Sequence, residues 1–172
     1  MRAEDLNLAG VTIARPTSAK LGFIMAAERT EGYEDLVGRS DEAWHRAALA
    51  DPRYAYFLAL RDDEPLGFVI LRDWNAPDQV THIKRIVITR PGQGFGKAFL
   101  NLILDEVFGK TQAHRLSLGL FPHNLRARRA YEGVGFKAEG VSRGSAYFHG
   151  VHHDELVMAI LKPEWRALRG VA

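Results

Sequence analysis

The pattern of hydrophobic and polar positions divides the chain into short strands and helices that follow one another without a linker or an internal repeat. Runs of β-branched and aromatic residues predict strands at 11–15, 54–60, 66–71, 81–88, 116–121, 136–148 and 155–161. Apolar residues at helical spacing predict helices at 17–29, 41–50, 95–108 and 125–132. The resulting order, βααβββαβαββ, is typical of an α+β domain with a mixed sheet.

The strand–helix–strand unit at 81–121 carries the clearest pattern. Glycine is common just beyond a helix end, so Gly109 is expected to terminate the helix of this unit. Because a helical crossover joins parallel strands, the strands on either side of the helix should lie parallel in the sheet. Five apolar residues share one stripe of the helix, namely Phe95, Phe99, Leu102, Ile103 and Val107.

Capping residues place the ends of two shorter helices. Ser40 is expected to cap a helix with acidic residues in its first turn, where negative charge suits the helix dipole. That helix should end at Asp51, since a residue before proline avoids helical geometry. Asn124 is expected to cap the last helix. The inner face of this last helix would carry Leu125, Ala130 and Tyr131.

The composition is that of one ordinary globular domain. The 172 residues are 47% hydrophobic and 26% charged, so we expect a single domain over 1–172. The sequence has no cysteine, which excludes a disulfide scaffold, a thiol nucleophile and thiolate metal ligands. The net charge of +2 gives no basic surplus, so we expect no nucleic-acid partner.

The sequence offers no clear targeting or membrane segment. Residues 1–7 include acidic side chains where a signal peptide requires an apolar run. No apolar stretch approaches the roughly 20 residues of a membrane helix. These features predict a soluble cytoplasmic protein without a membrane partner.

Three glycines at alternate positions, Gly92, Gly94 and Gly96, stand between a strand and a helix. They let the backbone turn tightly and let a ligand approach it, and the first turn of the helix offers free N–H groups that favour phosphate. A P-loop requires Ser or Thr after Gly-Lys, but Ala98 follows Lys97. A dinucleotide fingerprint requires a third glycine at position 97. Both nucleotide motifs therefore fail on spacing.

This loop resembles the pyrophosphate loop of the GCN5-related N-acetyltransferase (GNAT) superfamily, which runs Gln/Arg-x-x-Gly-x-Gly/Ala. Gly94 and Gly96 match the two glycines, whereas Pro91 stands at the first position. Residues 114–136, with the pattern HRLSL, then N-x-x-A-x-x-x-Y and GF, resemble the second signature of the family. Residues 154–165 resemble the closing strand of the branch that includes ribosomal-protein N-terminal acetyltransferases.

The resemblance covers residues 54–165 and implies a GNAT-like acyl-CoA N-acyltransferase fold, a mixed, mostly antiparallel twisted sheet with flanking helices. It also implies that acetyl-CoA is the co-substrate and that acetyl passes directly to a primary amine of a peptide or small molecule, without a metal. Asn124 would contact the pantetheine as well as cap its helix. The coenzyme site of the family carries over to Ile86, Val87, Ile88, Gly92, Gln93, Gly94, Phe95, Gly96, Lys97 and Asn124.

The resemblance also implies catalytic roles. Tyr131 would protonate the departing CoA thiolate, the alternative being a core aromatic residue. Related sequences often carry an acidic residue at the position of Gly119, which has no side chain to accept a proton. Either water relays the proton to another group or the amine arrives neutral. The candidate bases are His82, Glu28 and Glu31, and the two glutamates are also candidates for binding the acceptor.

Some features leave alternatives open. Gly119 and Pro91 depart from the family pattern, so a catalytically weak CoA-binding sensor or interaction module is a second hypothesis. Trp165 and Leu168 could contribute to a homodimer face. We expect no metal site, since neighbouring side chains of a strand point to opposite faces, as they would at His149, His152 and His153.

Overall fold

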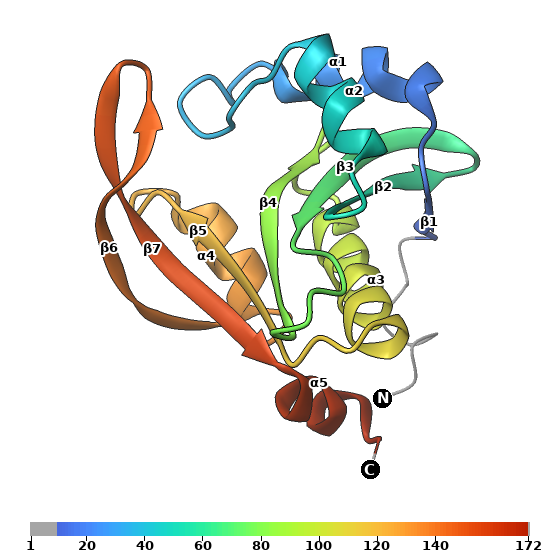
Figure 1. Cartoon of the computed structure of the whole chain (residues 1–172), viewed down its shortest axis with the longest axis vertical. Helices are drawn as coiled ribbons and strands as arrows, with labels where there is room; N and C mark the ends of the chain where they lie inside the picture. The colour runs from blue at the N-terminus through green and yellow to red at the C-terminus, as the bar shows by residue number, and fades with distance from the viewer. Residues whose placement is uncertain (1–9, 172) are drawn as a thin grey trace.

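One twisted sheet organises the molecule, whose computed structural model describes residues 10–171 (Figure 1). Within these residues seven strands have the order β1-β2-β3-β4-β5-β7-β6. Neighbouring strands are antiparallel except β4 and β5, which are parallel, so the predicted mixed, mostly antiparallel sheet is confirmed. The strands are β1 (Thr12–Ala14), β2 (Tyr54–Arg61), β3 (Glu64–Arg72), β4 (Val80–Ile88), β5 (Arg115–Leu120), β6 (Lys137–Phe148) and β7 (Val151–Leu161).

Helices cover both faces of the sheet and bury two apolar clusters. They are α1 (Leu21–Glu28), α2 (Glu42–Ala50), α3 (Phe95–Lys110), α4 (Leu125–Glu132) and α5 (Lys162–Arg169), with the short 3₁₀ helix η2 (Ser18–Lys20) before α1. On one face Phe99 of α3 packs in a cluster with Leu116 of β5. On the other face Ile24 of α1 packs with Phe68 of β3. Side-chain alternation along each strand supplies both clusters.

Three details at the helix ends differ from the prediction. Asp41 caps α2 in place of Ser40, because its carboxylate accepts a hydrogen bond from a first-turn N–H at 2.8 Å. Helix α3 continues one residue past Gly109, and Thr111 follows it with its hydroxyl donating to a carbonyl of the last turn at 2.6 Å. Leu125, predicted on the inner face of α4, is 55% exposed.

The C-terminal part holds a longer strand and one more helix than predicted. Strand β7 begins at Val151, since it pairs with β6 as far as the hairpin turn. Helix α5 begins where Glu164 Oε2 accepts a hydrogen bond from the preceding backbone N–H at 2.9 Å. Trp165 packs its ring against Phe108, and its indole donates to Asp105 at 2.7 Å. Because Trp165 is used within the chain, the homodimer hypothesis gains no support from it and stays a prediction.

Some predictions fall outside what the structure describes. Residues 1–7, on which the expected lack of a signal peptide rests, lie outside the described range. Among the described residues, no helix combines the length and the apolar character that crossing a membrane requires. The cytoplasmic location and the single domain over 1–172 stay predictions.

Strands β4 and β5 pair over only part of their length. Their parallel register ends at the pair Ile83 and Leu118. Directly afterwards Lys84 has no partner in β3, which marks a β-bulge. A bulge bends its strand, and the two strands diverge toward their carboxyl ends in Figure 1. We call the resulting gap the notch, which lies between residues 84–88 and 119–121.

Candidate active site

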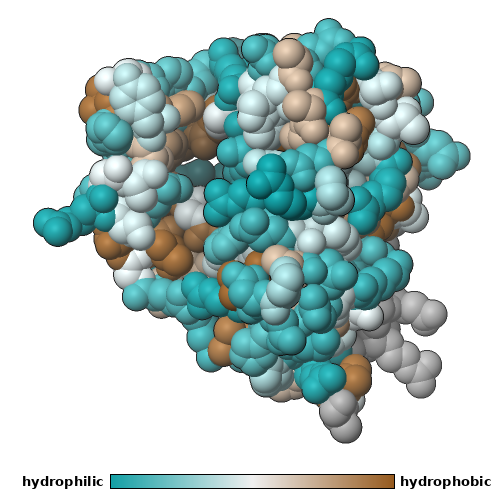
Figure 2. All heavy atoms as spheres, viewed as in Figure 1, coloured by the Kyte–Doolittle hydropathy of each residue, from teal (hydrophilic) through white to brown (hydrophobic). Residues whose placement is uncertain are grey.

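A cavity of about 520 Å³ occupies the notch. Its walls come from β4, β5, the starts of α3 and α4, the loop between α1 and α2 (residues 29–41, the α1–α2 loop) and the β6–β7 hairpin. Figure 2 shows a hollow between this hairpin and the rest of the molecule. The cavity therefore joins segments that are far apart in the sequence.

The backbone of β4 leaves hydrogen-bonding groups free along the notch. Thr89 N donates to Leu66 O at 2.9 Å, which fixes the alternation of hydrogen bonds between β3 and β4. By this alternation the N–H and C=O groups of Ile86 and Ile88 point away from β3, toward the notch. Of these groups, Ile88 O already accepts a hydrogen bond from the Tyr33 hydroxyl at 2.6 Å. Val87 has the opposite orientation, and its side chain is only 2% exposed in the cluster beside α1. Ile86 and Ile88, but not Val87, are thus placed to hydrogen-bond a ligand.

The loop before α3 forms a cradle of free N–H groups. Gly92 and Gly94 have φ values of 81° and 80°, a left-handed conformation that favours glycine. Gly94 is the N-cap of α3, and the first turn holds no acidic side chain. Ala98 N bonds to Gly94 O at 3.2 Å, so the N–H groups of residues 95–97 have no partner within the helix. An anion is the ligand that such a helix start favours.

The side chains of the predicted loop residues have different places. Lys97 and the three glycines of the loop line the cavity. Gln93 is exposed and does not line the cavity. Phe95 is 2% exposed, packs in the core and lies beneath the guanidinium of Arg61, which is 5.1 Å from the ring centroid. Phe95 can therefore offer a ligand only its backbone N–H.

Helix α4 brings two predicted residues to the opposite wall. Asn124 lines the cavity and caps α4, with its Oδ1 accepting from Ala127 N at 3.2 Å, which leaves the amide NH₂ for a ligand. Tyr131 also lines the cavity, and its ring packs edge-on against Phe136 at 5.6 Å. Among the described residues its hydroxyl has no hydrogen-bond partner. Burial raises the pKa of the Tyr131 hydroxyl, so it is protonated at neutral pH.

His82 lies outside the cavity, at the end of β4 that is still paired with β5. Its Nδ1 is 2.6 Å from the hydroxyl oxygen of Ser117, and its Nε2 is 3.8 Å from Asp73 Oδ2. Burial, reinforced by Arg72, lowers the pKa of His82. With both ring nitrogens facing these groups, its position argues against the predicted role as catalytic base.

The two glutamates expected to bind the acceptor also lie outside the cavity wall. Glu28 is fully buried, and its carboxylate forms an ion pair with Arg85, approaches His45 Nε2 to 3.0 Å and accepts from Ser40 N at 3.2 Å. This burial excludes direct contact with a substrate, although Arg85 itself lines the cavity. Glu31 is exposed on the α1–α2 loop.

Comparison with known proteins agrees with this geometry. The model of the Acetyltransferase (GNAT) family matches residues 20–136 of the chain. The chain belongs to the GNAT family. This confirms the resemblance and, with the sheet described above, the predicted fold.

Two curated relatives match part of this GNAT chain. The probable N-acetyltransferase YjcK of Bacillus subtilis is 36% identical over 73 residues, which are 42% of this chain and 40% of the relative. The putative ribosomal N-acetyltransferase YdaF of the same organism is 30% identical over 74 residues, which are 43% of this chain and 40% of the relative. The chain thus spans about two fifths of the length of the curated relatives that it matches.

Solved structures share the fold over nearly the whole GNAT chain. Spermidine N-acetyltransferase from Vibrio cholerae, solved in complex with CoA and spermine, has a TM-score of 0.79 and 21% identity, covering 91% of this chain and 98% of that one. The ribosomal-protein-S18-alanine N-acetyltransferase from Escherichia coli has a TM-score of 0.71 and 19% identity, covering 88% and 93%. At such identities the likeness concerns the fold alone.

Sequence reasoning missed parts of the GNAT site that come from distant segments. Tyr33 lines the cavity from the α1–α2 loop, and its hydroxyl donates to Ile88 O at 2.6 Å. Glu155 lines the cavity from β7, on the side of the sheet opposite the buried Leu156. Alternation along β7 could have placed Glu155 on an open face, but the register of β7 against β5 has no signal in the sequence.

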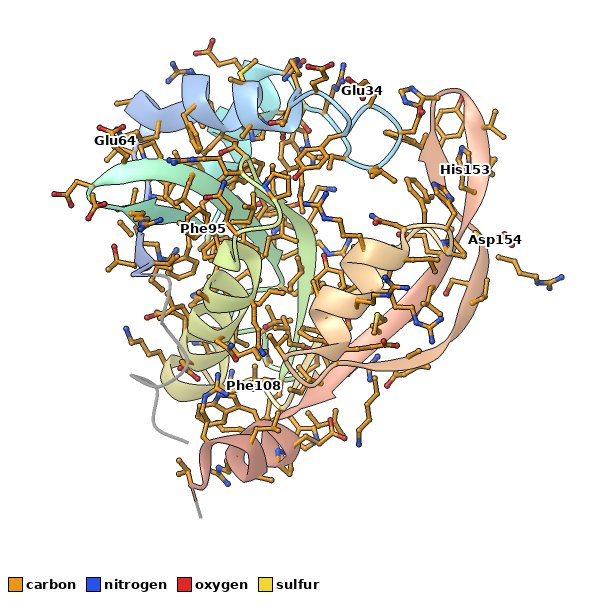
Figure 3. All side chains as sticks on the ribbon, turned by 180° about the vertical axis from the view of Figure 1, so that it is seen from behind. Glu34, Glu64, Phe95, Phe108, His153 and Asp154 are labelled. Carbon is orange, nitrogen blue, oxygen red and sulfur yellow. The ribbon has the colours of Figure 1, made fainter. Side chains whose placement is uncertain are left out.

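The β6–β7 hairpin and the α1–α2 loop meet beside the cavity of the GNAT chain. His149 Nε2 lies 2.8 Å from Glu34 O, so the histidine holds the hairpin tip against the loop. Figure 3 shows Glu34 on the loop opposite the hairpin that carries His153. His153 Nε2 is 3.0 Å from the backbone oxygen of Phe148, and the His152 ring lies beside Tyr147 at 5.1 Å. The three histidines therefore contact three different groups.

Proposed function

We propose that this GNAT chain is an N-acetyltransferase that uses acetyl-CoA and transfers the acetyl group directly to a primary amine of a peptide or small molecule. One observation carries the proposal. The free backbone edge of β4, the free N–H groups at the start of α3 and the Tyr131 hydroxyl all border one cavity. A long ligand with an acyl end and a diphosphate fits this arrangement of groups.

The residues present suit coenzyme A. A Cβ built on Gly92 or Gly94 would meet no atom within 4 Å, so the cradle is open at both glycines. Backbone groups of Ile86 and Ile88 would hold the pantetheine, helped by the Asn124 amide. The N–H groups of residues 95–97 would hold the diphosphate, because the positive end of the helix dipole favours phosphate.

The proposed reaction needs no enzyme-bound acyl group. The sequence has no cysteine, which agrees with direct attack of the amine on the thioester carbonyl carbon. The new C–N bond forms as the C–S bond breaks, and Tyr131 gives its proton to the departing sulfur. Burial of the phenol keeps that proton in place until a thiolate, equally desolvated in the cavity, develops beside it.

The lining of the cavity supports an acceptor with a single positive charge. Among the described residues that line it, Glu155 is the one carboxylate. Positive charge comes from Lys84, Lys97, Arg126 and Arg85, the last of which is paired with Glu28. Aromatic rings stand on the same walls, including Phe148 of the hairpin. A polycation would meet repulsion here, so we propose a primary amine next to an apolar or aromatic group.

The test is release of free thiol from acetyl-CoA in the presence of single amines. The panel contains a short peptide with a free N-terminus and an apolar first residue, phenethylamine and spermidine, and mass spectrometry identifies the acetylated product. We expect release with the first two and much slower release with spermidine. Acetyl-CoA binding in calorimetry without turnover on any amine would favour the CoA-binding sensor instead.

A further inference from the structure

We propose that the carboxylate of Glu155, on β7, holds the acceptor amine and takes the proton that the amine loses. This inference rests on the proposed N-acetyltransferase function and adds the missing acid–base group to it. Glu155 lies within residues 154–165, which resemble a closing strand of the family, but that resemblance gave it no role. The contact that points to this role is between Glu155 and a glycine of the neighbouring strand.

Glu155 fills the place of the absent side chain at Gly119. A Cβ built on Gly119 would lie 2.9 Å from Glu155 Cδ and closer still to its Oε2. The register explains this proximity, because Gly119 of β5 pairs with Val157 of β7, and Glu155 is the next residue along β7 on the same face. A carboxylate is therefore present where Gly119 provides none, delivered from the adjacent strand.

The carboxylate faces the cavity and not the core. Leu118, Leu120 and Leu156 are buried in the cluster shared with α3, so Gly119 and Glu155, one residue away on their strands, face the opposite side. Both residues line the cavity, as does Tyr131. The proposed base and the proposed acid thus border the same space.

The partners of Glu155 leave it ready for a cation. Ser145 donates its hydroxyl to Glu155 Oε1 at 2.9 Å, which holds the side chain in place. Among the described residues, no Lys, Arg or His nitrogen lies within ion-pair distance of Glu155, unlike Glu28 with Arg85 or Glu139 with Arg115. A half-buried carboxylate without a counter-ion favours binding of an ammonium group from solution.

The chemistry balances with two groups of this chain. An ammonium group bound at Glu155 first releases one proton to solvent, and the neutral amine then attacks the carbonyl carbon. The nitrogen becomes positively charged as it forms this bond, and it is then a far stronger acid than a free ammonium group. Glu155 Oε2 accepts the proton from this nitrogen, while Tyr131 gives a proton to the sulfur as the C–S bond breaks. Solvent then returns a proton from Glu155 to Tyr131, which restores both residues.

The experiment compares Glu155→Gln with Glu132→Gln, which makes the same charge change on an exposed glutamate of α4 outside the cavity wall. At saturating acetyl-CoA we expect kcat of E155Q to fall about 100-fold, in the range of acid–base catalysis. Acetyl-CoA affinity and E132Q kcat should stay within twofold of the unsubstituted protein.

A relocation variant separates chemistry from folding. The pair Gly119→Glu and Glu155→Gly moves the carboxylate to β5, and we expect it to recover at least about tenfold over Glu155→Gly alone. E155Q with kcat within threefold of the unsubstituted protein would overturn the inference while leaving the N-acetyltransferase function intact. An unsubstituted protein that binds acetyl-CoA and releases no thiol with any amine would overturn both.

Discussion

The carboxylate of Glu28 and the guanidinium of Arg85 form a buried ion pair that joins helix α1 to strand β4 directly after its bulge. His45 of α2 joins the pair with Nε2 at 3.0 Å from Glu28, and its Nδ1 is 2.9 Å from the Tyr56 hydroxyl. Arg85 also lines the cavity. The pair therefore links the helical cover of the sheet to the shape of the notch.

Replacing Glu28 by Ala should destabilise the protein strongly. The change leaves the Arg85 charge buried without its partner, and breaking a buried pair in this way costs about 3–5 kcal/mol of unfolding free energy. The matched control is Glu31→Ala, which removes an exposed carboxylate from the same region. This change should alter the free energy of unfolding by less than about 0.5 kcal/mol. Urea unfolding measures both, and equal stability of the two variants would contradict the structural role of the pair.

Replacing Tyr131 by Phe should lower kcat by about 10²-fold or more, since the proton donor for the sulfur is lost. Affinity for acetyl-CoA should stay nearly unchanged, because the ring still packs against Phe136. Tyr54→Phe is the control, a hydroxyl removed from β2 outside the cavity wall. Full turnover of Tyr131→Phe at saturating substrates would mean that the thiolate leaves without this acid.

Replacing Gly94 by Val should abolish acetyl-CoA binding. The valine side chain would stand in the open cradle that the diphosphate is proposed to occupy, and φ of 80° is strained for a branched residue. Gly170→Val is the matched control, since Gly170 has φ of 64° and open space around it at the far end of the chain. If calorimetry finds normal acetyl-CoA binding to a folded Gly94→Val protein, the diphosphate does not bind at this loop.

Local features of the site could be predicted because the signal lies within a few residues. The loop with Gly92 and Gly94 requires left-handed backbone angles that glycine adopts easily, and the apolar stripe of α3 follows at once. Asn124 caps α4 as expected, so Tyr131 reaches the same wall two turns later. Spacing along the chain was sufficient in each case.

Features that depend on distant pairing could not be predicted. Glu28 was expected to bind the acceptor, but it forms an ion pair with Arg85 of β4. No local sequence pattern indicates this pairing, because the two residues are far apart in the chain. Glu155 reaches its position through the register of β7 on β5, which the hydrophobic pattern leaves open. At the helix ends Ser40 and Asp41 are both good caps, so only the observed hydrogen bond to Asp41 decides between them.

Replacing His82 by Asn should reduce the loss of stability in acid and leave kcat unchanged. Burial lowers the pKa of His82, so the unfolded chain takes up this proton at higher pH than the folded one. The contribution of neutral His82 to the free energy of unfolding is therefore complete above its pKa in the unfolded chain, about 6.5. It is lost as the pH falls toward the lower pKa of the folded protein. Urea unfolding between pH 7.5 and 5 measures the slope, with the exposed His152→Asn as control. An unaltered slope would mean that His82 titrates alike in both states, and a large fall in kcat would restore it as a candidate base.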